Sequence, residues 1–257
     1  LEDTPIFTAQ EPVDIPYRVF PALNKIINNI ENNSELLPAY TRDLKFRLIA
    51  RDNNENGGGT GWANVSFRAD ASAGPFMLTY PSQLSTFEIG EEVEITWDVA
   101  NTDNAIINCQ YVNIWLSTDA GYNYEELLSF NTPNDGVEKV IIPNNLTNIG
   151  RIKIEATNNI FFDITNNYTR IIEPNEASYY IEASPKYQQI CLPSVVNVNI
   201  ETEAYKGYDS NLHFEVLSGL PEEVEVSFNP ENVKPGEPLI MNLDFSNRSM
   251  SELYNIE

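Results

Sequence analysis

The residues that could catalyse a reaction form no recognised catalytic pattern in this sequence. The one histidine, His213, lies in an alternating segment, without the second histidine that a His-Glu-x-x-His zinc site requires. A serine hydrolase triad would have to use His213, yet the chain has no Gly-x-Ser-x-Gly turn. A glycosidase with two carboxylates stays an alternative, although no spacing selects a pair. We therefore predict that His213 is a strand-surface or packing residue and that this chain is not an enzyme.

Two acidic turns carry the oxygen atoms that calcium prefers. Asp52 opens a polar loop over residues 52–61, and Asp119 lies in a Ser-x-Asp-x-Gly turn that ends in Tyr124. That turn resembles an Asp-box, a hairpin device whose aspartate accepts backbone amides while its glycine supplies an unusual backbone angle. We expect the Asp119 turn to be a folding device and the Asp52 loop to be a solvated turn. The alternative is a calcium site, for which calcium would take roughly six to eight oxygen ligands, and its candidate ligands are Asp52, Asp119 and Asp135, with Asp135 close to Asp119.

The balance of charges limits the partners. The chain has 257 residues and a formal net charge of −23. Such a charge repels phosphates, so we expect no nucleic-acid partner. The chain contains no apolar run of about 18 residues, so we expect no membrane insertion. A strongly acidic chain fits a secreted or cell-surface protein. Cys109 and Cys191 are expected to be two separate buried thiols, with one disulfide between modules as the alternative.

Alternating apolar and polar residues predict antiparallel strands over most of the chain. The runs begin at Leu44, Val93, Val112, Ile152, Val196 and Val224. A period of two is typical of sheets with one buried face, and turn residues separate the runs at intervals typical of β-sandwiches. Residues 22–31 could form one short helix. The chain is thus expected to be all-β.

Local signals within these runs give finer predictions. Asn134-Asp135-Gly136 predicts a β-hairpin, because Asp-Gly tolerates the positive φ angles of a tight turn. The loop 52–61 predicts a longer hairpin connection. We expect Trp97 in a core and Trp115 partly exposed, and we expect Trp62 to pack the glycine loop down.

We predict that the chain is divided into three modules, with the first boundary at Ala73-Gly74-Pro75, where one strand ends and the next begins. Boundaries near 74 and 173 give a partial β-sandwich over 1–74, an immunoglobulin-like β-sandwich over 75–173, and a third over 174–257. The third is expected to be truncated at its C-terminus, so only the middle module is expected to be whole.

Motifs in all three modules resemble one protein family. The first set lies at 17–23, 37–48, 51–53, 57–59 and 73–76, and the second at 95–102, 112–119, 131–136 and 151–156. The third is Gly219-Leu220-Pro221, then 226–230 and 233–236. Together they resemble the immunoglobulin-like accessory modules of secreted bacterial reprolysin-like zinc metalloproteases. The resemblance implies tandem immunoglobulin-like modules downstream of a catalytic domain that this chain does not contain.

These observations lead to a function of binding or positioning. We expect a non-catalytic accessory or adhesion region of a secreted or cell-surface bacterial metalloprotease. Its partners would be the catalytic domain of the parent chain and an extracellular protein or polysaccharide surface. The alternative is a set of purely structural, calcium-stabilised sandwich modules with no ligand of their own.

Overall fold

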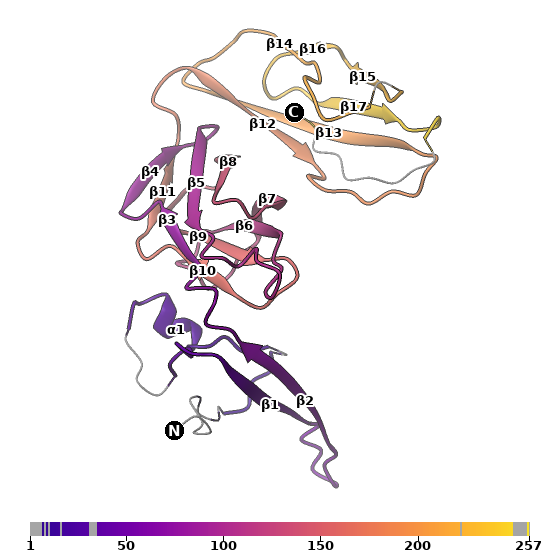
Figure 1. Ribbon diagram of the computed structural model, residues 1–257. Coiled ribbons are helices and arrows are strands. Elements are labelled where there is room, and N and C mark those ends of the chain that lie inside the picture. The colour runs from indigo at the N-terminus through magenta and orange to yellow at the C-terminus, as the bar shows by residue number, and fades with distance from the viewer. Residues whose placement is uncertain are drawn as a thin grey trace. The chain divides into compact units, whose positions relative to one another are not determined.

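Nearly all of the regular secondary structure in the computed structural model is β-strand, as the alternation predicts (Figure 1). It describes residues 7, 9, 11–15, 17–30, 35–221, 223–248 and 256. The predicted short helix is present as α1 (Leu23–Ile26), which ends before Asn29 with its positive φ of 53°. Within the described residues, no helix has the length and hydropathy of a membrane span.

The contacts within the chain define two compact units. The first comprises Leu1–Ser85, Glu94–Val140 and Thr147–Arg170, and the second comprises Thr86–Val93, Ile141–Leu146 and Ile171–Glu257. These two units do not test the three predicted modules, so the boundaries near residues 74 and 173 stay predictions.

A long hairpin follows α1. β1 (Arg42–Arg51) pairs antiparallel with β2 (Thr60–Ala69) in an unbroken register, so the loop between them is the hairpin connection that the sequence predicts. One face of this two-stranded sheet is apolar. Phe46 on that face packs against the ring of Phe67, with centroids 5.3 Å apart, and against Phe20 at 5.0 Å. The other face is polar and exposed.

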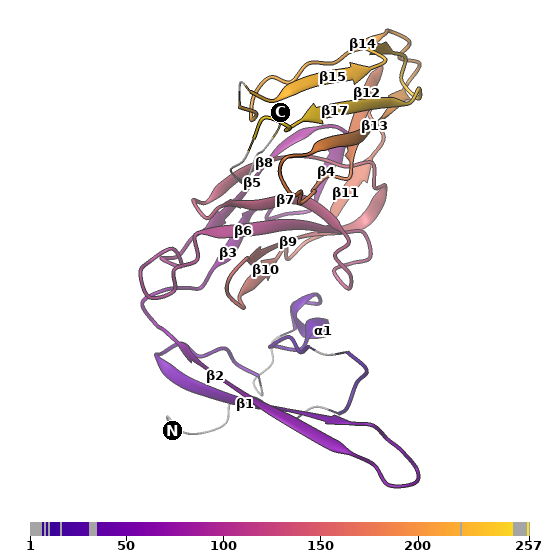
Figure 2. The same ribbon diagram turned by 90° about the vertical axis from the view of Figure 1, so that its right-hand side faces the viewer.

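The strands from Met77 to Ile172 form two antiparallel sheets. The smaller has the order β3 (Met77–Tyr80), β5 (Glu92–Asp98), β8 (Val137–Ile141). The larger has the order β4 (Ser85–Glu88), β11 (Thr169–Ile172), β9 (Thr147–Ala156), β6 (Tyr111–Ser117), β7 (Glu126–Pro133), with β10 (Phe162–Ile164) also paired to β9. In Figure 2, β9, β6 and β7 lie side by side.

This strand order is that of an immunoglobulin-like sandwich. With the short β4 and β10 left aside, the first, second and fifth strands (β3, β5 and β8) share one sheet, and the third, fourth, sixth and seventh (β6, β7, β9 and β11) share the other. The alternating residues fill its interior: Ile95, Ile114 and Ile154 each have no exposed surface. Trp97 is 4% exposed, which confirms its predicted place in a core.

The turn at Asn134-Asp135-Gly136 differs from the prediction. It connects β7 in the larger sheet to β8 in the smaller one, so it crosses between sheets and closes no hairpin. Gly136 does have the positive φ, 102°, that Asp-Gly predicts. The dipeptide specifies a tight turn, but it does not decide which sheet the following strand joins.

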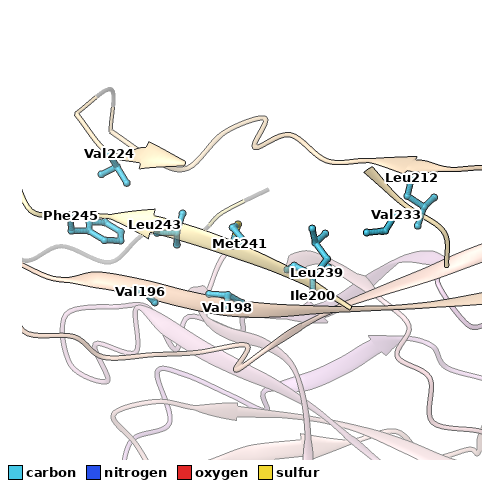
Figure 3. Close-up of a cluster of buried hydrophobic side chains, with 10 residues drawn as sticks. All are labelled: Val196, Val198, Ile200, Leu212, Val224, Val233, Leu239, Met241, Leu243 and Phe245. Atoms are coloured by element: carbon cyan, nitrogen blue, oxygen red, sulfur yellow. The ribbon is translucent and has the colours of Figure 1, made fainter. Parts of the chain in front are cut away.

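The second unit contains a further pair of sheets. One has the order β12 (Ser178–Ser184), β13 (Val195–Tyr205), β17 (Leu239–Asp244), β15 (Glu225–Asn229), and the other pairs β14 (Leu212–His213) with β16 (Asn232–Val233). Side chains from both sheets share one core, which Figure 3 shows. Its buried members are Val196, Val198, Ile200, Leu212, Val224, Val233, Leu239, Met241, Leu243 and Phe245.

The two cysteines are free thiols. Cys109 is buried, as predicted, and burial raises its pKa. Cys191 is exposed, so the prediction of a second buried thiol is wrong. Cys191 lies between β12 and β13 and belongs to neither strand, so the alternation of the strands does not place it on a buried face.

Candidate functional site

The Ser-x-Asp-x-Gly turn is built around the Asp119 carboxylate. The Ser117 hydroxyl donates to Asp119 Oδ1 at 2.7 Å, and the amides of Tyr122 and Asn123 donate to the same oxygen at 3.1 and 2.9 Å. Burial alone would raise the pKa of Asp119, but these hydrogen bonds hold it below its usual range. The turn is therefore the folding device that the sequence predicts.

Gly121 lets the same turn approach a neighbouring arginine. Its φ is 98°, and a Cβ atom there would lie 3.0 Å from Ile27 Cγ2, 3.1 Å from Tyr124 Oη and 3.2 Å from Arg151 Cδ. Arg151 belongs to β9 and lies directly opposite Ser117 of β6. The turn, the strand and the segment that carries Ile27 thus meet at one point.

Arg151 is the charged centre of this site. Its side chain is nearly fully buried, with 4% exposure. Nη2 donates to the carbonyl of Ile27 at 2.5 Å, Nη1 donates to the carbonyl of Thr165, and the guanidinium lies 4.8 Å from the ring centroid of Tyr168. Burying a cation is costly unless hydrogen bonds replace its water, and here two backbone carbonyls and an aromatic face do so.

A second buried charge orders the N-terminal segment itself. Glu35 is 2% exposed, pairs with Arg18 and accepts the amide of Ala22 at 2.9 Å. Ala22 is the residue before α1, so the carboxylate holds the start of this short helix. The helix then presents Ile27, 4% exposed, to Gly121 and Arg151.

One more contact fixes the segment beyond Ile27. The Asn29 side-chain amide donates to the Asn166 carbonyl at 2.9 Å. We call Ile27, Asn29, Gly121 and Arg151 the arginine junction. It fastens residues 22–30 to the sandwich through a buried cation, one amide and one apolar side chain.

Aromatic and charged side chains line the outer face of the sheet beside the junction. Lys153 Nζ lies 4.7 Å from the ring centroid of Tyr124 and 5.7 Å from that of Trp115, and it pairs with Glu155 at 2.7 Å. Burial raises the pKa of Tyr124 well above its usual value, against the opposing effect of the Arg151 cation. Trp115 is half-buried, which agrees with the partial exposure predicted for it.

The structure does not bring the three predicted calcium ligands together. Asp119 precedes β7 and Asp135 follows it, so they lie at opposite ends of an eight-residue strand, and the expectation that they are close is wrong. Asp52 lies in the β1–β2 loop, where its Oδ1 accepts the amides of Gly59 at 2.9 Å and Asn54 at 3.2 Å. Hydrogen bonds from Asn54 and Gly59 lower its pKa. Across the described residues, no three His, Cys, Asp or Glu side chains gather as a metal site would require.

Asp135 instead borders an open depression on the sandwich. Its lining residues are Asp98, Val99, Ala100, Asn101, Asp103, Gln110, Pro133, Asn134 and Asp135. Below it lies Asn134, 6% exposed, which accepts from Trp97 Nε1 at 2.8 Å and donates to Thr102 Oγ1 and the Cys109 carbonyl at 2.9 Å each. The depression therefore rests on a fully bonded polar layer.

Sequence reasoning missed both Asn134 and Arg151. Asn134 lies in a turn motif that is usually exposed, and Arg151 lies on the outer face that the alternation of β9 predicts to be wet. His213 is exposed on β14, with Nδ1 3.2 Å from Asn232 Oδ1, which confirms it as a strand-surface residue.

The comparisons with known proteins are sparse. No family model matches the chain, and no curated protein matches it. Among solved structures, 375 chains match, one of them titled "Chimeric titin Z1Z2 functionalized with a KLER exogenous peptide from decorin". This chain is 16% identical to it over 66% of its own length and 80% of that chain, with a TM-score of 0.24. The immunoglobulin-like assignment accordingly rests on the strand order described above.

Proposed function

We propose that this chain is a non-catalytic accessory region of a secreted or cell-surface bacterial metalloprotease, which spaces and orients the catalytic domain of the parent chain. Binding to an extracellular protein or polysaccharide surface would be its second task. The resemblance of its motifs to such modules motivates the protease assignment. The arginine junction is the structural observation that supports the spacing role.

A spacer that orients the catalytic domain has to hold its own segments in a fixed orientation, and loosely tethered segments do not do so. Interfaces between domains of one chain are usually small and polar, so relative motion is the default. The arginine junction opposes that default, because the 4%-exposed Arg151 bonds to a backbone carbonyl 124 residues away. Displacing residues 22–30 would leave this cation without one of its two carbonyl partners, which is costly in a dry environment.

The experiment replaces Arg151 with Met and measures ¹⁵N relaxation of α1 and of β6. In the parent chain, α1 is expected to tumble with the same correlation time as β6. In R151M, α1 is expected to relax faster, since its fastening is lost. The matched control is R170M, because Arg170 is exposed on the neighbouring strand and bonds only to Asn148 Oδ1.

The outcome that contradicts the spacing role is independent motion of α1 in the parent chain. Equal relaxation of α1 in R151M and R170M would also contradict it, because Arg151 would then not hold the segment. A structural calcium-stabilised role receives no support of its own, since the carboxylates of Asp52 and Asp119 already accept turn amides.

A further inference from the structure

The polar face of the β1–β2 hairpin gathers cations. Register pairs Arg47 with Asn64 and Ile49 with Trp62, and alternation sends these side chains to the same face. We call this surface the basic face. Its members are Asp43, Lys45, Arg47, Ile49, Arg51, Thr60, Trp62, Asn64, Ser66 and Arg68.

The charge of these strands is opposite to that of the chain. β1 and β2 together contain five of the 15 Lys and Arg residues and one of the 38 Asp and Glu residues. Four of the five cations lie on the basic face, and all four are exposed. In a chain with a net charge of −23, so local a concentration needs an explanation other than composition.

Trp62 supplies the second observation. It is 65% exposed, so the prediction that it packs the glycine loop down is wrong. The Arg47 guanidinium lies 4.6 Å from its ring centroid, and Arg47 Nε donates to Asn64 Oδ1 at 3.0 Å. These contacts orient the Trp62 ring on the face and leave most of the side chain exposed. Large aromatic side chains are usually buried, and an exposed one held in place is typical of a binding surface.

From this arrangement we infer that the basic face binds an anionic polysaccharide. The Trp62 ring stacks on the apolar face of a sugar ring, Lys45, Arg51 and Arg68 bind its carboxylate or sulfate groups, and Asn64, Ser66 and Thr60 bond its hydroxyls. The long two-stranded ribbon, with ten paired residues on each strand, suits a linear polymer. This inference rests on the surface-binding task of the proposed function, to which it gives a site and a ligand class, and it does not depend on the spacing role.

A single-stranded nucleic acid is the competing anionic polymer, and the face fits it less well. Nucleic-acid channels combine cations with several aromatic side chains on which successive bases stack. The basic face has one aromatic residue, and its uncharged polar members, Thr60, Asn64 and Ser66, are short hydrogen-bonding side chains. The experiment below therefore compares binding to poly-thymidylate with binding to dextran sulfate.

The experiment measures retention of the whole chain on immobilised dextran sulfate, with uncharged dextran as the matched matrix. The parent chain is expected to bind dextran sulfate and to elute as salt rises, because exposed charges are screened within about 10 Å at 0.1 M salt. Replacing Lys45 and Arg51 with Glu is expected to weaken binding by about tenfold or more, since two exposed contacts become repulsive. The control with the same charge change is K139E/K206E, at two exposed lysines elsewhere.

Trp62→Ala separates sugar recognition from attraction between charges. It is expected to weaken binding to dextran sulfate while leaving the salt dependence unchanged, because no charge is lost. All the substituted side chains are exposed, and unchanged circular dichroism will confirm that each variant folds.

Three results would overturn the inference: no retention of the parent chain on dextran sulfate, equal loss in the face and control variants, or tighter binding to poly-thymidylate than to dextran sulfate. None of them bears on the arginine junction, which R151M tests. Conversely, R151M is expected to bind dextran sulfate as the parent chain does, so the two proposals can fail separately.

Discussion

Gly121 is the position where one methyl group tests the arginine junction most directly. A Cβ there would lie 3.0 Å from Ile27 Cγ2, which is tighter than ordinary van der Waals contact. Tyr124 and Arg151 lie at similar distances, but both belong to the sandwich itself. Ile27 belongs to the docked segment, so it is the neighbour that can move away. Gly121→Ala should therefore push the segment off the sheet before it disturbs the sandwich.

The expected cost has two parts. A non-glycine residue at a φ of 98° costs about 1–2 kcal/mol in backbone strain. Overpacking of a filled site adds about 1–3 kcal/mol. Gly236→Ala is the matched control, since Gly236 has a φ of 91° and nothing within 4 Å of its added Cβ. It should cost about 1–2 kcal/mol, the strain alone. Gly121→Ala should cost more by the packing part.

Two assays measure this difference. Urea unfolding gives the free energy of each variant, scored on the transition of the unit that carries the substitution. Trypsin cleavage after Lys25 in α1 reports local opening of the segment. We expect faster cleavage in Gly121→Ala than in either the parent chain or Gly236→Ala. Equal stability losses together with unchanged cleavage would refute the view that Gly121 matters through Ile27.

Three further predictions concern the turns. Asn134→Ala should destabilise the sandwich by about 3 kcal/mol and shift Trp97 fluorescence, because it leaves Trp97 Nε1, Thr102 Oγ1 and the Cys109 carbonyl without this hydrogen-bond partner. Asn159→Ala, at an exposed position, should change the free energy of unfolding very little. The lowered pKa of Asp119 means that its ionised form stabilises the fold above about pH 4, and that this contribution is lost as the pH falls through the folded-state pKa. Asp119→Asn should thus be less stable than the parent chain at pH 7 and approach it in acid, which pH-dependent urea unfolding will measure. The unfolding temperature should be the same in calcium and in chelator, because Asp52 and Asp119 already accept backbone amides, and a rise of several degrees in calcium would contradict this.

The strands were predictable because their signal is local. Alternation places Ile95, Ile114 and Ile154 on inward faces, and all three have no exposed surface. The same pattern in β1 predicts burial of Leu48, which is 61% exposed. Alternation shows which face is apolar, but burial also needs a layer to cover it. Among the described residues, Phe20 packs on Phe46 of that face, whereas Leu48 stays exposed to solvent.

The site was not predictable because its signal is non-local. Arg151 alternates with Ile152, so the sequence assigns it to the wet face of β9. It is buried because Ile27, 124 residues earlier, lies over it. Asn134 is similar, since its three partners come from the β5–β6 connection and from β5 itself. Neither residue carries a local pattern that distinguishes it from an exposed turn or strand position.

The chemistry of the guanidinium explains why an arginine, and no other cation, suits this junction. Two carbonyls from distant segments must accept hydrogen bonds from one side chain at once, and Arg151 gives each its own terminal nitrogen. Its flat surface also lies near the ring of Tyr168, which a compact ammonium would match less well. Lysine at this position would keep the positive charge, but its ammonium group is more strongly hydrated and would align less well with the two carbonyl groups. Arg151→Lys should consequently release α1 nearly as far as R151M does, and full retention of the docked segment in the lysine variant would show that charge alone holds it.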